Sequence, residues 1–94
     1  MLGRMSEQRI QMNMPPELAG GVYADFVRAW HTQDAFVLDF ANLVEPVRTE
    51  DDAVLLNATV VARVRIPPAQ VFELMKALEQ QLSAWEKETG KESG

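Results

Sequence analysis

Residues 53–88 hold the clearest pattern of apolar and polar positions in the chain. Every even position from Leu56 to Ile66 is apolar, and β-branched residues are frequent there. Because successive side chains of a strand point to opposite faces, this alternation predicts a strand with one apolar face. Pro67 and Pro68 end the strand, since proline cannot donate to a ladder and suits the first turn of a helix.

A helix is predicted from Pro68 to about residue 88. Apolar side chains recur at helical spacing and form one stripe: Val71, Leu74, Met75, Leu78, Leu82 and Trp85. Gly90 is well placed just beyond the helix C-terminus. We interpret the stripe as the side that packs on the sheet, and the alternative is a groove for a foreign helix or a ligand.

Three further strands are predicted upstream, at residues 9–14, 22–31 and 36–42, from alternation between turn-forming residues. The chain is therefore expected to be α+β: a four-stranded, mainly antiparallel sheet (β-β-β-β-α) covered by one C-terminal amphipathic helix. A single domain at 9–88 would lie between a flexible N-terminus (1–8) and a flexible C-terminal tail (89–94).

The hairpin between the second and third strands sets their register. A three-residue loop, Thr32–Asp34, would place Phe26 and Trp30 on the same face as Phe40. This loop requires Asp34 in the left-handed conformation. The one long loop is expected at 43–52, and its four acids match no calcium-loop spacing, so we expect no metal there.

Composition narrows the functional classes. The chain has 94 residues, which make one domain, and no cysteine, which excludes disulfides, thiolate metal sites and cysteine nucleophiles. A net charge of −5 argues against a general nucleic-acid binder. Without a long apolar run or a secretory signal, we expect a cytoplasmic protein with no membrane contact, whose natural start is Met1 or Met5.

One helix can cover only one face of the predicted sheet. The other face keeps more apolar surface than water normally covers, and self-association would bury it. We therefore expect a homo-oligomer, a dimer or larger. The candidate oligomer or partner interface is Tyr23, Val27, Val37 and Val61.

Few residues suggest chemistry. His31, the one histidine, is expected at a surface turn. Asp25 and Asp39 share a face in the expected register, but no nucleophile lies near them, so pairing with Arg63 or Arg65 is favoured over a catalytic dyad. We expect the protein to have no enzymatic activity, no cofactor and no bound metal.

A small basic strip is the other candidate surface. Arg9, Arg63 and Arg65 would lie together if the first strand ran beside the fourth. Strands can read DNA in a groove, although the acidic total makes nucleic acid an improbable partner. The function expected is a homo-oligomeric interaction module that binds protein or peptide through an apolar sheet face or helix groove; the alternative is a dimeric DNA-binding regulator.

Four segments resemble a known family. They are residues 21–27 (GVYADFV), 35–40 (AFVLDF), 64–68 (VRIPP) and 74–78 (LMKAL). Together they resemble short prokaryotic proteins grouped as a domain of unknown function, family three-four-six-seven. The resemblance covers most of residues 20–86. It implies a small stand-alone α+β domain, and it supplies no activity, ligand or functional residue.

Overall fold

The computed structural model of the chain describes residues 8–92, and the first helix or strand among them is a short 3-10 helix, Pro16–Leu18. The strand predicted at residues 9–14 does not form, and its apolar side chains are exposed. Alternation alone is not enough for a strand, which also needs a neighbour for its backbone groups. Of the flexible ends predicted at residues 1–8 and 89–94, residues 1–7 and 93–94 lie outside the described residues.

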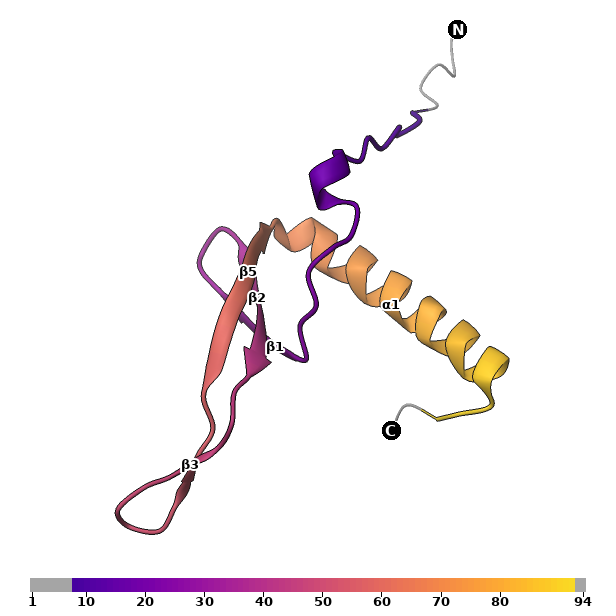
Figure 1. Ribbon diagram of the computed structural model, residues 1–94. Helices are drawn as coiled ribbons and strands as arrows, with labels where there is room; N and C mark the ends of the chain where they lie inside the picture. The colour runs from indigo at the N-terminus through magenta and orange to yellow at the C-terminus, as the bar shows by residue number, and fades with distance from the viewer. Residues whose placement is uncertain (1–7, 93–94) are drawn as a thin grey trace, which may run out of the picture.

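Three strands form the main sheet: β1 (Phe26–His31), β2 (Phe36–Leu43) and β5 (Ala58–Ile66). Their order is β1-β2-β5 and both pairings are antiparallel, so β2 is central (Figure 1). The α+β class and the antiparallel sheet are confirmed. The expected four-stranded sheet is wrong, because the first predicted strand is missing from it.

A two-stranded extension continues the β2–β5 hairpin beyond the main sheet. β3 (Val47–Arg48) pairs with β4 (Val54–Leu55), within and beside the segment predicted as a long loop. Valine and leucine at these positions favour extended backbone. The turn between them places Asp52 at φ 66°, the left-handed conformation that the sequence analysis expected at Asp34.

The predicted register of the first hairpin is wrong. His31 pairs with Phe36, so the loop has four residues, and the Thr32 N–H donates to the Ala35 carbonyl at 2.8 Å. An even-length loop pairs even positions with odd ones. Phe26 is therefore opposite Ala41, on the face away from Phe40.

A β-bulge divides β5 into two parts. Phe40 pairs with Ala62 and Ala41 pairs with Val60, so Val61 has no partner residue on β2. An extra residue shifts the alternation by one position. As a result Val60 lies on one face of the sheet and Ala62 on the other, and the single apolar face predicted for this strand is wrong.

The helix α1 (Pro68–Thr89) begins two residues after β5 ends, as predicted. It ends at Gly90, which has φ 71° and donates its N–H to the Glu86 carbonyl at 2.8 Å. The helix does not cover the sheet. It runs away from the end of β5 (Figure 1). Leu78, in the middle of its stripe, is 60% exposed.

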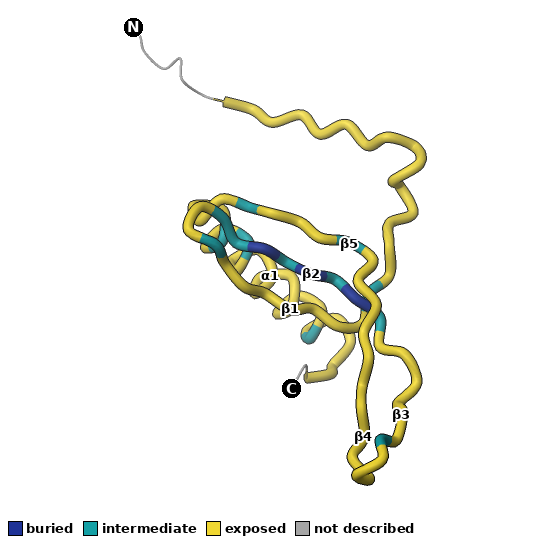
Figure 2. Tube along the Cα trace, turned by 90° about the vertical axis from the view of Figure 1, so that its left-hand side faces the viewer, coloured by how far each residue is buried: buried dark blue, intermediate teal, exposed yellow. Residues whose placement is uncertain are grey.

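Buried residues are confined to the central strand (Figure 2). Among the described residues the buried side chains are Val37, Asp39 and Ala41, all on β2. The Cα radius of gyration is 19.0 Å, whereas a compact chain of this length has about 12 Å. The chain is therefore extended, and most of its apolar surface faces solvent.

Candidate functional site

The sheet has two chemically different faces. One, here called the charged face, carries Arg28 and Trp30 from β1, Asp39 from β2 and Arg63 and Arg65 from β5. The other, here called the apolar face, is formed by the following side chains: Val27, Ala29, His31, Phe36, Leu38, Phe40, Ala62, Val64 and Ile66. The pairing registers fix this division, because neighbours directly across a ladder share a face.

Asp39 is the centre of the charged face. Its side chain is 2% exposed, and four donors bind its two oxygens. Arg63 donates from Nε to Oδ1 at 2.6 Å and from Nη2 to Oδ2 at 3.1 Å. Arg28 Nη2 and Trp30 Nε1 each donate to Oδ2 at 3.0 Å. The predicted pairing of Asp39 with an arginine of β5 is confirmed.

These donors hold Asp39 in its ionised form. The Arg63 hydrogen bonds, followed by those of Trp30 and Arg28, hold the pKa of the Asp39 carboxyl far below its usual range. The carboxylate in turn raises the pKa of the Arg63 guanidinium. A general base should have a pKa near the working pH and a free lone pair. The geometry therefore suits Asp39 to organising the arginines rather than to proton transfer.

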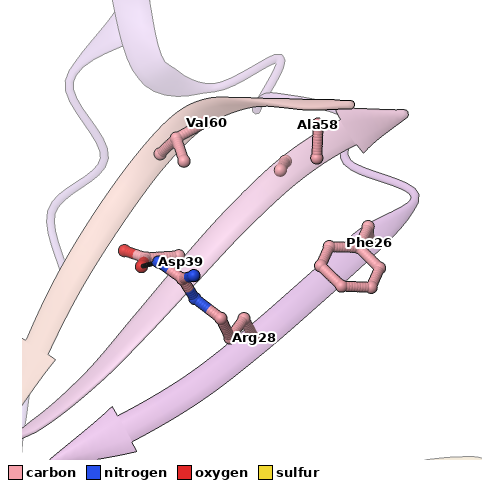
Figure 3. A pocket seen from close by; sticks show the side chains of 6 residues that line it. Phe26, Arg28, Asp39, Ala58 and Val60 are labelled. Carbon is pink, nitrogen blue, oxygen red and sulfur yellow. Dashed lines mark hydrogen bonds and ion pairs between the residues drawn. The ribbon is translucent and has the colours of Figure 1, made fainter. Parts of the chain in front are cut away.

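A pocket opens beside this cluster (Figure 3). Its volume is about 140 Å³, and its walls are Phe26, Arg28, Asp39, Ala41, Ala58 and Val60. The alanines leave the space, and the bulge aims Ala58 and Val60 at it. Pockets that bind drug-sized ligands have volumes of about 300–1,000 Å³, so this smaller pocket has room for one apolar side chain with a polar group beside it.

The apolar side of α1 is also open. Phe72, Met75, Leu78 and Leu82 are exposed and line a shallow groove on the helix. Lys76 lies beside them, with its Nζ 4.9 Å from the centre of the Phe72 ring and 3.5 Å from a Glu73 carboxylate oxygen. The hollow lies where the alternative to core packing placed a groove for a foreign helix or a ligand, and binding there stays a prediction.

The predicted interface residues do not form one surface. Tyr23 precedes β1 and is 79% exposed, and Val27 and Val61 are also exposed. Val37 is fully buried, so its expected exposure is wrong. It also lies on the face opposite Val27, because Val37 pairs with Trp30 and Val27 pairs with Phe40.

The predicted basic strip is present in part. Arg63 and Arg65 share the charged face. Arg9 lies in the segment before the first 3-10 helix, outside both sheets, so strand pairing does not hold it beside them. Arg28 takes the place expected for Arg9, from the opposite side of the sheet.

The candidate acid–base residues have structural surroundings. The Asp25 carboxylate accepts from the Leu43 backbone N–H at 3.0 Å and is not paired with Asp39. His31 is exposed at the end of β1, as predicted, with its ring centre 5.5 Å from that of Phe36. Within residues 8–92 no group of acids and histidine is arranged to hold a metal ion.

The sequence analysis missed Arg28 and Trp30. A signal was present, because Asp39 stands between apolar neighbours in its strand and a buried carboxylate needs donors. A four-residue loop at 32–35 would have placed Arg28 directly opposite Asp39. The choice of an odd loop turned both residues to the wrong face.

Comparison with known proteins identifies a family. No curated protein and no solved structure matches this sequence. Over residues 8–92 the structure has no helix that is long and apolar enough to cross a membrane. The model of the family described as "Protein of unknown function (DUF3467)" matches residues 3–91. This match spans nearly the whole chain and agrees with the resemblance seen in its strand and helix motifs, so the chain belongs to that family.

Proposed function

We propose that this protein is a cytoplasmic, homo-oligomeric interaction module that binds protein or peptide and catalyses no reaction. The observation that carries the proposal is the amount of apolar surface left open. Val37 and Ala41 are the buried apolar residues among those described, although 47% of the chain is apolar. A single-domain protein is normally stabilised by burying such residues.

Two open surfaces support binding of a protein rather than of a small molecule. The apolar face is uncovered and the hollow on α1 is open to solvent, whereas the pocket beside Asp39 has room for a single side chain. Large contiguous apolar patches that are exposed on a protein mark interaction sites. The N–H groups of Arg28 and Arg63 that do not reach Asp39 could orient a peptide carbonyl or carboxylate at the pocket.

Light scattering on a size-exclusion column tests the proposal. We expect twice the 10.6 kDa chain mass, or more, at micromolar concentration. Fluorescence anisotropy with labelled apolar peptides then tests partner binding, with little change between 50 and 200 mM salt. A protein that is monomeric at every concentration and binds none of the peptides would contradict the proposal.

A DNA-binding regulator is the second candidate. It is favoured by Arg28, Arg63 and Arg65 lying on one face, although Asp39 neutralises part of their charge. A dimer would present six such arginines. A DNA complex of that kind should lose about 10³-fold in affinity between 50 and 200 mM salt. Titration of a labelled duplex at both salt concentrations distinguishes it from a peptide binder.

A further inference from the structure

We infer that the apolar face of each protomer is covered by the helix α1 of a second copy of this chain, in a two-fold exchange. This inference rests on the proposed homo-oligomer and names its contact. Each protomer carries both halves of the contact, an uncovered sheet face and an uncovered apolar helix. A dimer with a two-fold axis would make this contact twice and would cover the sheet face and the helix of each chain.

The junction between β5 and α1 explains why the cover comes from another copy. Only Pro67 lies between Ile66 and Pro68, and its backbone is extended, at φ −70° and ψ 153°. To lie on its own sheet, the helix would have to reverse along β5 within that one residue. Loops between a strand and a helix commonly have two to six residues, and the two prolines fix φ at the junction.

The dimensions of the two surfaces agree. A helix of 22 residues is about 33 Å long, and a strand of nine residues is about 30 Å long. A helix about 10 Å wide therefore has a footprint of about 330 Å². Two such contacts, counted on both surfaces, bury about 1,300 Å², which is within the range of stable protein interfaces.

The side chains also agree in character. The described part of the apolar face carries no acid, lysine or arginine, and its aromatic and aliphatic residues stand opposite one another across the strands. The stripe of α1 is equally apolar, with Lys76 and Glu79 at its rim. An apolar centre with a charged rim is the usual composition of a protein interface. In this dimer the second copy occupies the apolar face and the groove of α1. The charged face, with the pocket beside Asp39, stays outside the contact and is where a peptide partner would bind.

Cysteine cross-linking tests the arrangement, because the chain has no cysteine of its own. The test variant carries Val64→Cys on the apolar face and Leu78→Cys on α1. The control carries Val60→Cys with the same Leu78→Cys. Val60 and Val64 are both on β5 and are 47% and 43% exposed, but they lie on opposite faces. A short bismaleimide should give a covalent dimer with a 64–78 cross-link in the test variant only.

Other cross-links would overturn the inference. A 78–78 cross-link without a 64–78 cross-link would mean that two helices pair with each other. A 60–78 cross-link would place α1 on the charged face, and a 64–78 cross-link within one chain would mean that the helix folds back. In each case a mass of two chains would leave the proposed homo-oligomer intact, whereas a monomer would remove both proposals.

Lengthening the junction provides a second test. Insertion of Gly-Ser-Gly-Ser between Pro67 and Pro68 should let α1 reach its own sheet, and should raise the dimer dissociation constant at least tenfold. The same insertion after Glu50, in the β3–β4 turn, is the control and should leave it unchanged. An unchanged dissociation constant in the junction variant would contradict the role given to Pro67.

Discussion

Arg63 donates two parallel hydrogen bonds to the Asp39 carboxylate across the β2–β5 ladder, from Nε to Oδ1 at 2.6 Å and from Nη2 to Oδ2 at 3.1 Å. The same guanidinium lies 5.5 Å from the centre of the Trp30 ring, which itself donates to Asp39. One carboxylate thereby ties all three strands of the main sheet together. A fork of this kind fixes geometry as well as charge, which lysine could not do in its place.

Replacing Asp39 should change how stability depends on pH. The pKa of Asp39 is lowered in the folded state, by Arg63 first and then by Trp30 and Arg28. The stability from the ionised carboxylate is therefore fully present above the unfolded pKa of about 4, and it is lost as the pH falls below that value. Asp39→Asn should be less stable at pH 7 and should lose much of this acid dependence.

Urea unfolding of the two proteins between pH 3 and pH 7 measures this effect. Asp34→Asn is the control, because it removes the same charge from an exposed turn residue. It should unfold like the original chain at every pH. Equal acid dependence in the Asp39→Asn and original proteins would show that other carboxyl groups dominate the transition.

Val37 should contribute more to stability than its size suggests. It is fully buried between Trp30 and Arg65 on the central strand. Val37→Ala removes two methyl groups and should lower the free energy of unfolding by about 2 kcal/mol. Val47→Ala, on the exposed strand β3, should change it by no more than about 0.5 kcal/mol. Similar losses in both variants would mean that Val37 is not part of a packed core.

Leu78 should act on association rather than on the fold of one protomer. It is 60% exposed in the single chain and central to the stripe that we place on the partner's sheet. Truncation of a buried leucine costs at least about 2 kcal/mol, and a two-fold dimer loses it twice. Leu78→Ala should therefore raise the dimer dissociation constant roughly 10³-fold.

Analytical ultracentrifugation over a concentration series measures this change. Gln80→Ala is the control, because it lies on the opposite side of α1 and should leave the dissociation constant unchanged. A Leu78→Ala protein that dimerises as tightly as the original would place the stripe outside the interface.

The β3–β4 turn should prefer glycine at position 52. Asp52 has φ 66°, where a Cβ atom is unfavourable. Asp52→Gly and Asp52→Ala both remove the hydrogen bond that Arg48 donates to the carboxylate at 2.7 Å. Their difference therefore isolates the backbone, and the alanine variant should open this hairpin more easily by about 1 kcal/mol. The Thr49 N–H donates to the Ala53 carbonyl, so its hydrogen exchange measures the free energy of opening this hairpin.

Local pattern was enough to predict much of the fold. The strand ending at Ile66, the helix from Pro68 and its end at Gly90 all depend on neighbouring residues and on proline and glycine geometry. The family resemblance in residues 21–27 and 64–68 was confirmed as well. Short-range chemistry fixes these features within one element.

The features that were predicted wrongly depend on contacts between elements. The bulge at Val61 is invisible in the alternation of β5, because valine suits either face. The bulge turns Ala58 and Val60 to the charged face, where they form part of the pocket beside Asp39. The length of the loop before Phe36 is likewise fixed by the pairing of His31 with Phe36 across the two strands. Segment 9–14 alternates like a strand but has no partner strand, and a single sequence does not show which partners exist.

The single residue between β5 and α1 has a consequence for cellular abundance. If α1 covers the sheet of a second copy, as we infer, the stability of the chain depends on its concentration. Its melting temperature should rise with concentration, and at low expression the protomers should be degraded before they meet. Under the inferred exchange, the short junction at Pro67 would therefore link the lifetime of each chain to the concentration of its copies.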